Sequence, residues 1–213
     1  MAMTGFDPSV VNQSIGAVNA AYENLMYALG DQMQNQFVGG LADKWACNSA
    51  VNFFNTAFKP AIDELLKSAN MVFESVVSSM NSAAQAWAQQ TESSYAAKPF
   101  SAITKTIDVS GIQENIGGIR GIDLDTATTV AGKLPAIASS ATEALTRAQQ
   151  AVQNCGFVGG NQAGNLIASL GVIKDKISNA TETITTQTKS AIDTTIQQYG
   201  DLEGKVSQAF SAQ

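Results

Sequence analysis

The side chains that most often carry out nucleophilic, acid–base or metal chemistry are nearly missing from this chain. Its 213 residues include no histidine and only two cysteines, Cys47 and Cys155. Without histidine the chain lacks the usual general base near neutral pH and the commonest metal ligand, and the cysteine spacing matches no zinc motif. Neighbouring carboxylates such as Asp63 and Glu64 have no histidine or metal-binding cluster near them in the sequence, and we expect them to lie on solvated helix faces. We therefore expect no enzymatic activity, no metal and no cofactor.

Glycine pairs are the next candidates for chemistry, because glycine-rich loops can cradle phosphate. Gly39-Gly40 and Gly159-Gly160 lie in no Walker or dinucleotide-binding pattern. Glycine also permits positive φ angles, so we predict that both pairs form hairpin turns. The formal net charge of −6 disfavours a phosphate backbone as partner, and we expect no nucleic acid.

The elements that would carry these turns are repeated. Phe-Val-Gly-Gly occurs at residues 37–40 and again at 157–160, and the openings Gly-Phe-Asp at 5–7 and Gly-Ile-Asp at 121–123 also match. The repeated tetrapeptide, together with the similar sequences at which the two segments begin, indicates two copies of one structural unit. In each copy the aspartate is a predicted helix N-cap.

Apolar residues then recur at steps of three and four, which places them on one face of a helix. Pro60 should kink its helix or restart it near Lys59, and Pro135 should kink its helix. Each copy is thus predicted to be a shorter helix, a turn and a longer helix. The apolar positions of the first shorter helix are Val11, Ile15, Val18, Tyr22, Leu25, Leu29 and Met33.

We predict an all-α protein whose two tandem helical hairpins pack antiparallel as an elongated four-helix bundle. The first hairpin spans residues 1–95, a linker spans 96–121 and the second hairpin spans 122–213. An antiparallel arrangement requires the linker to travel back along a helix, which takes about 14 to 23 residues at about 3.3 Å each, and the linker is long enough. We expect a monomer, with Cys47 and Cys155 too far apart for a disulfide.

The first turn, Gly-Gly-Leu-Ala-Asp-Lys-Trp-Ala-Cys at residues 39–47, resembles the WXG (ESAT-type) substrates of type VII secretion. These are helical hairpins with a tryptophan and a glycine in the turn, and they dimerise into antiparallel four-helix bundles. Cys47 stands where the family has its glycine, and the second turn has no tryptophan. The resemblance covers the chain outside the linker and implies a family-type dimer formed within one chain.

Family substrates carry an export signal of tyrosine, three residues and then an acidic residue after the hairpin. Tyr199 and Glu203 fit this pattern, and one helical turn would place them on the same face; an ordinary tyrosine near the seam is the alternative. The resemblance implies two partners, the membrane ATPase of the secretion machinery and an unidentified protein target. The protein would be secreted or at the cell surface and virulence-associated. Residues 1–8 do not resemble a cleaved signal peptide.

Two alternatives stay open at Trp45, which either is a recognition residue at an exposed tip or packs over the hairpin end. Two other functional classes also stay open. An α-helical pore-forming toxin would use the isoleucine-rich stretch 103–122 as a concealed membrane segment, and a filament-like structural protein would polymerise. We expect no stable membrane span, since no apolar run approaches about 18 residues.

Overall fold

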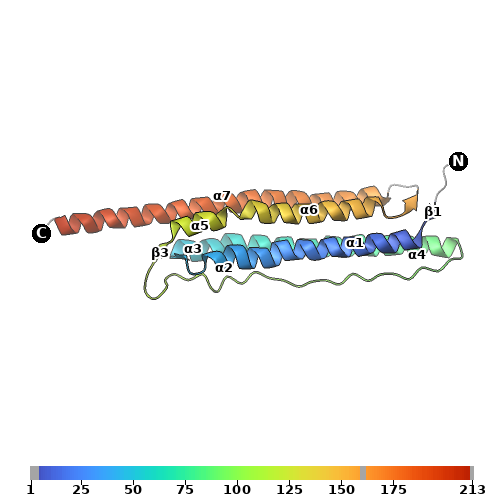
Figure 1. The fold of residues 1–213 in the computed structure, drawn as a ribbon, viewed down its shortest axis with the longest axis horizontal. Coiled ribbons are helices and arrows are strands. Elements are labelled where there is room, and N and C mark those ends of the chain that lie inside the picture. Colours follow the sequence, from blue (N-terminus) through green and yellow to red (C-terminus); the bar gives the residue numbers. More distant parts are fainter. Residues whose placement is uncertain (1–4, 159–161, 212–213) are drawn as a thin grey trace. The chain divides into compact units, whose positions relative to one another are not determined.

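A computed structural model describes residues 5–158 and 162–211 of the chain (Figure 1). Gly159 and Gly160 therefore lie outside the described residues. Helices dominate, which confirms the all-α prediction. The helical elements are α1 (Pro8–Met26), η1 (Tyr27–Val38), α2 (Gly39–Leu41), α3 (Asn48–Phe53), η2 (Phe54–Phe58), α4 (Lys59–Gln90), α5 (Leu124–Ala131), α6 (Leu134–Gln153) and α7 (Gln162–Ser211). The strands have two residues each: β1 (Gly5–Phe6), β2 (Trp45–Ala46), β3 (Gly121–Ile122) and β4 (Phe157–Val158).

The two repeated openings have the same structure, a short strand followed by an aspartate that caps a helix. The Asp7 carboxylate accepts hydrogen bonds from the backbone N–H groups of Ser9, at 2.8 Å, and Val10, at 3.3 Å. Asp123 accepts from the N–H of Thr126 at 3.1 Å and from its hydroxyl at 2.9 Å. Both bonds satisfy donors that the first helical turn leaves free. The predicted caps are confirmed.

The chain divides into two compact units, and each unit combines residues from both predicted hairpins and from the linker. Unit 1 contains Met1–Leu29, Glu64–Lys105 and Ala138–Ser178, and unit 2 contains Gly30–Asp63, Thr106–Ile137 and Asn179–Gln213. The division into units crosses the segments 1–95 and 122–213, because α4, α6 and α7 each have residues in both units.

In unit 1 the start of the first hairpin pairs with the turn of the second. Strands β1 and β4 are antiparallel, with Gly5 opposite Val158 and Phe6 opposite Phe157. Helix α1 leaves this pair and α6 runs into it, so the two helices have opposite directions. The buried core of the unit draws on both hairpins and includes Val11, Ile15, Phe73, Leu145 and Leu170.

Unit 2 repeats the arrangement with the roles exchanged. The turn of the first hairpin pairs with the start of the second through β2 and β3, with Trp45 opposite Ile122 and Ala46 opposite Gly121. Here the first hairpin runs into the strand pair and α5 leaves it. The two pairings confirm the predicted antiparallel packing of the hairpins. Buried core residues of this unit include Phe37, Phe54, Phe58, Val130 and Ile184.

The helical geometry differs from the uniform coiled-coil spacing that we predicted. Segments η1 and η2 are π-helical, and in both regions the apolar positions recur at steps of four rather than alternating three and four. The wider turn of a π-helix keeps residues with this longer spacing on one face. The buried residues concerned are Leu25, Leu29, Met33, Phe37 and Leu41 in the first region, and Phe54, Phe58 and Ile62 in the second.

The two prolines have different outcomes. Pro60 does not restart its helix, because the π-helical segment η2 continues directly into α4 and Lys59 is in the helical conformation. Where we predicted a kink at Pro135, a turn at residues 132–133 separates α5 from α6, which begins at Leu134. Pro135 thus stands in the first turn of α6, where its missing N–H costs no hydrogen bond. Among the described residues, no helix combines the length and the apolarity needed to cross a membrane.

Candidate functional site at the tryptophan turn

The predicted turn glycines of the first hairpin are helical, which corrects the prediction. Gly39 and Gly40 lie in α2, and the turn follows at residues 42–44. A Cβ on Gly40 would lie only 2.9 Å from Val130 Cγ2 of α5. Glycine is therefore favoured at this position because α5 packs closely on α2, and not because the backbone needs a positive φ angle.

Trp45 follows this turn and is fully buried, with 0% of its side chain exposed. Its ring stacks on Phe53 with centroids 6.0 Å apart and meets Phe54 edge-on at 6.2 Å. The interpretation as an exposed recognition residue is thus wrong, and the packing alternative is correct. The backbone of the turn is held by β3, and the Asp123 N–H donates to the Lys44 carbonyl at 2.7 Å.

A small polar cluster satisfies the buried indole N–H. Trp45 Nε1 donates to the hydroxyl of Thr195 on α7 at 3.2 Å. That hydroxyl also lies 2.8 Å from Ser49 Oγ and 3.7 Å from Cys47 Sγ, and Cys47 Sγ lies 3.0 Å from Ser49 Oγ. The cluster joins the first hairpin's turn to the second hairpin's long helix. The sequence analysis did not identify this role of Thr195, for which the available signal is a hydroxyl at a buried position of α7.

Tyr199 lies one turn beyond Thr195 on α7 and is half-buried. Burial raises the pKa of its phenol; nearby Cys47 raises that pKa further, and the Arg120 guanidinium lowers it. The tyrosine therefore stays neutral and keeps its hydroxyl proton at physiological pH. Glu203 belongs to the same helix, but its side chain lies outside the described residues.

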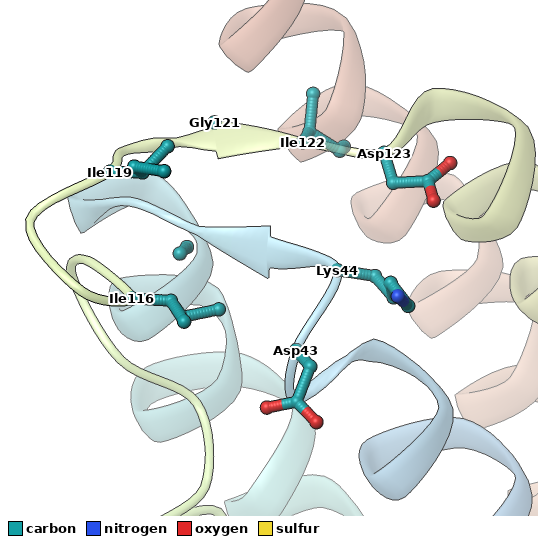
Figure 2. A pocket seen from close by; sticks show the side chains of 8 residues that line it. Asp43, Lys44, Ile116, Ile119, Gly121, Ile122 and Asp123 are labelled. Carbon is teal, nitrogen blue, oxygen red and sulfur yellow. The ribbon is translucent and has the colours of Figure 1, made fainter.

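A pocket of about 390 Å³ opens beside the tryptophan turn (Figure 2). Ile116 and Ile119 lie at one side of the pocket, and Lys44 and Asp123 lie at the other. The two isoleucines close a tight turn through hydrogen bonds of 2.8 and 3.0 Å. Gly117 and Gly118 form its tip with φ angles of 58° and 85°, values that favour glycine in this kind of hairpin turn.

The side chains of this region offer apolar and hydrogen-bonding contacts. In the part of the chain that the structure describes, no group of acidic or cysteine side chains could hold a metal ion. The Cys47 thiol is surrounded by the hydroxyls of Ser49 and Thr195, and neither hydroxyl is a base that could activate it. The pocket instead offers aliphatic walls with charges at its rim, which suits an apolar side chain of another molecule.

Comparison of the chain with protein-family models, with curated proteins and with solved structures finds no match.

Proposed function

We propose that the protein is a non-enzymatic, secreted pair of helical hairpins that acts by binding another protein. In this proposal a type VII secretion machine exports the chain by recognising Tyr199 and Glu203 on α7. The two hairpins of the chain pair with each other, so that the protein is exported as a monomer, whereas WXG proteins are exported as dimers.

One observation carries the proposal, namely that the tryptophan turn of the first hairpin docks on the second hairpin. Trp45 donates to Thr195 on α7, and β2 pairs with β3. A hairpin whose turn is completed by another hairpin has no need of a second chain. This supports a fused pair, since the contacts that would otherwise bind a partner chain are made inside one chain.

The position of Tyr199 supports the export signal. Its ring lies next to the docked turn, and it is held in a helix that continues to Ser211. A tyrosine and an acidic residue one turn apart on a helix present a single face to a receptor. Formation of the tryptophan turn and presentation of the tyrosine thus depend on the same stretch of α7.

The test is export of variants from a host with a working type VII system. Tyr199→Ala and Glu203→Gln should each reduce the secreted fraction by about tenfold or more if the signal is read directly. Tyr27→Ala and Glu182→Gln are matched controls, because Tyr27 is 54% exposed on η1 and Glu182 is exposed on α7. Both controls should be exported normally.

Circular dichroism and thermal melting of all four variants separate recognition from folding. The proposal requires that the Glu203→Gln protein has wild-type helicity and melting temperature, because the substitution keeps the size and helix propensity of the side chain. Normal export of both signal variants would contradict the proposal. Export that fails only in variants with lowered melting temperatures would also contradict it.

A further inference from the structure

The first part of the linker, residues 96–103, is held to unit 1 by side chains that bond to its backbone. In Figure 1 the chain leaves α4 and continues as an extended trace without helix or strand. Five side chains of α1 and α4 donate to or accept from its peptide groups, and we call them the backbone-binding site. They are Asn12, Asn19, Tyr22, Asn70 and Asn81.

Asn81 contacts both polar groups of one linker residue. Its Nδ2 donates to the Lys98 carbonyl at 2.7 Å, and its Oδ1 accepts from the Lys98 N–H at 3.1 Å. At Ile103 the N–H donates to the Tyr22 hydroxyl at 2.6 Å, and the carbonyl accepts from Asn70 at 3.1 Å. A neighbouring β-strand would satisfy an extended chain in the same way. These hydrogen bonds thus recognise extended backbone and do not depend on the side chains of the bound residues.

The same device occurs independently in unit 2. Gln34 accepts from the N–H of Asp108 at 2.8 Å and donates to its carbonyl at 2.9 Å. There, however, the linker is also anchored by burial, since Ile107, Val109 and Ile112 are 1%, 7% and 5% exposed. In unit 1 most side chains of residues 96–103 are exposed, and only Phe100 and Ile103 are half-buried. Few buried contacts mean a low cost of local opening.

The resident segment leaves the backbone-binding site incompletely used. Asn12 and Asn19 each donate through Nδ2 to a linker carbonyl, at Ala96 and Pro99 respectively. Yet the Oδ1 atoms of both asparagines are buried without a hydrogen-bond partner among the described residues. A buried acceptor without a partner is costly. At Asn19 the residue whose carbonyl is bound is Pro99, and proline has no N–H that could donate to the amide oxygen.

We propose that the α1–α4 face of unit 1 is a binding site for an extended peptide segment of another protein, which displaces the chain's own residues 96–103. The preferred ligand has a backbone N–H where the linker has Pro99, and an aromatic residue where Phe100 packs on Tyr22, with ring centroids 4.8 Å apart. Residues 96–103 act as a tethered ligand, which occupies the backbone-binding site until a peptide with higher affinity displaces it. This inference does not depend on the proposed export signal, and its test is independent of the export experiments.

The tether gives residues 96–103 a high effective concentration at the site, so the test begins by weakening the resident segment. Phe100→Ala in the full-length protein removes the ring contact without altering the site, and Ile103→Ala is a second variant of the same kind. A fluorescent peptide with the sequence of residues 94–105 and alanine at position 99 is then titrated by anisotropy. We expect saturable binding, about tenfold tighter to either variant than to the wild-type protein.

Two peptides isolate the bond at Asn19. Alanine and N-methylalanine at position 99 differ only in the N–H, and we expect the alanine peptide to bind about fivefold or more tightly. The substitution Asn19→Ala, made in the Phe100→Ala protein, should abolish that difference. Asn55→Ala is the control, because the Asn55 amide bonds only to the Val51 carbonyl of its own helical segment, and it should leave the difference intact.

Each other outcome overturns the inference. If neither linker variant binds the alanine peptide, the five side chains serve the tethered segment alone. If both peptides bind with equal affinity, the assignment of the ligand to the Asn19 acceptor is wrong. If the linker variants instead dimerise with wild-type protein by exchanging residues 96–103, as sedimentation would reveal, the occupant is a second copy and not another protein.

Discussion

The tetrapeptide Phe-Val-Gly-Gly occurs twice in the chain, and its first two residues have a different structure at each place. At residues 37–40 it is helical, spanning the end of η1 and the first residues of α2. At residues 157–158 its first half is strand β4, which pairs with β1. In the first hairpin the corresponding strand is Trp45–Ala46, which follows the tetrapeptide.

This difference shows that a repeated sequence motif need not form the same structure in both copies. A short apolar stretch with glycines has no strong preference of its own, so tertiary contacts decide its structure. In the first copy, helix α5 packs against Gly40. In the second copy, the chain leaves α6 through Gly156, which has a φ angle of 77°. The structurally equivalent parts of the two hairpins are the strands β2 and β4, and not the two copies of the tetrapeptide.

The largest expected effect tests whether the tryptophan turn is the main anchor of unit 2. Trp45→Ala removes a fully buried indole that packs on Phe53 and Phe54. We expect a loss of about 3–5 kcal/mol in the free energy of unfolding, measured by urea denaturation with circular dichroism. A loss below about 1 kcal/mol would show that this turn contributes no more than an exposed one.

Gly156→Ala is the next largest change and tests the turn of the second hairpin. The added Cβ would meet Val10 Cβ at 2.9 Å, in a backbone conformation that alanine rarely adopts. We expect a loss of about 2–4 kcal/mol from the combined strain and overlap. The companion substitution Val10→Ala should restore only part of the loss, because it relieves the overlap and leaves the backbone strain. Complete rescue would contradict this account.

Thr195→Val tests the polar cluster that joins the hairpins. The substitution keeps the shape of the side chain but removes the acceptor for Trp45 Nε1, which leaves a buried donor without a partner. We expect a loss of about 1–3 kcal/mol. Thr195→Ser retains the hydroxyl and should cost clearly less in the same denaturation experiment. Equal losses would assign the effect to packing.

Gly40→Ala tests the helical role of the first tetrapeptide. The new methyl group would overlap Val130, while alanine favours the helix by up to about 1 kcal/mol, so we expect a modest net loss of about 1 kcal/mol. In a double-mutant cycle Val130→Ala should rescue the Gly40→Ala variant, in contrast to the partial rescue at Gly156. A turn glycine would show no such coupling to Val130.

The smallest effect is expected at the tip of the linker turn. Ile119 is 74% exposed, and Ile119→Ser should therefore change the free energy of unfolding by less than about 0.5 kcal/mol. A larger loss in thermal melting would mean that the turn beside the pocket contributes to the core, which would remove the distinction between the buried tryptophan turn and its exposed neighbour.

Much of the fold could be predicted because it depends on local rules. The caps at Asp7 and Asp123 and the buried face of α1 follow from residue type and spacing. The antiparallel packing followed from the length of the linker, since only a return path needs that many residues.

The site could not be predicted in the same way, because its contacts join residues far apart in sequence. That Gly40 makes room for Val130, and that Trp45 is buried against Thr195, depends on how the two hairpins pack. The bonds from Asn81 and Gln34 to the linker depend on its path over the helices. Spacing within one segment carries no information about such contacts.

The bond between Trp45 and Thr195 also fixes the order of events during synthesis. The two residues are 150 positions apart, and a ribosome adds about 5–20 residues per second. In a nascent chain the acceptor for the indole N–H is therefore synthesised about 8–30 seconds after Trp45. Strand β1 likewise has no partner until β4 is synthesised. Both compact units include part of α7, so neither unit is complete until α7 emerges. Until then the first hairpin lacks the surfaces that bury its apolar side chains in the complete protein. Synthesis of α7 supplies the last missing residues of both units.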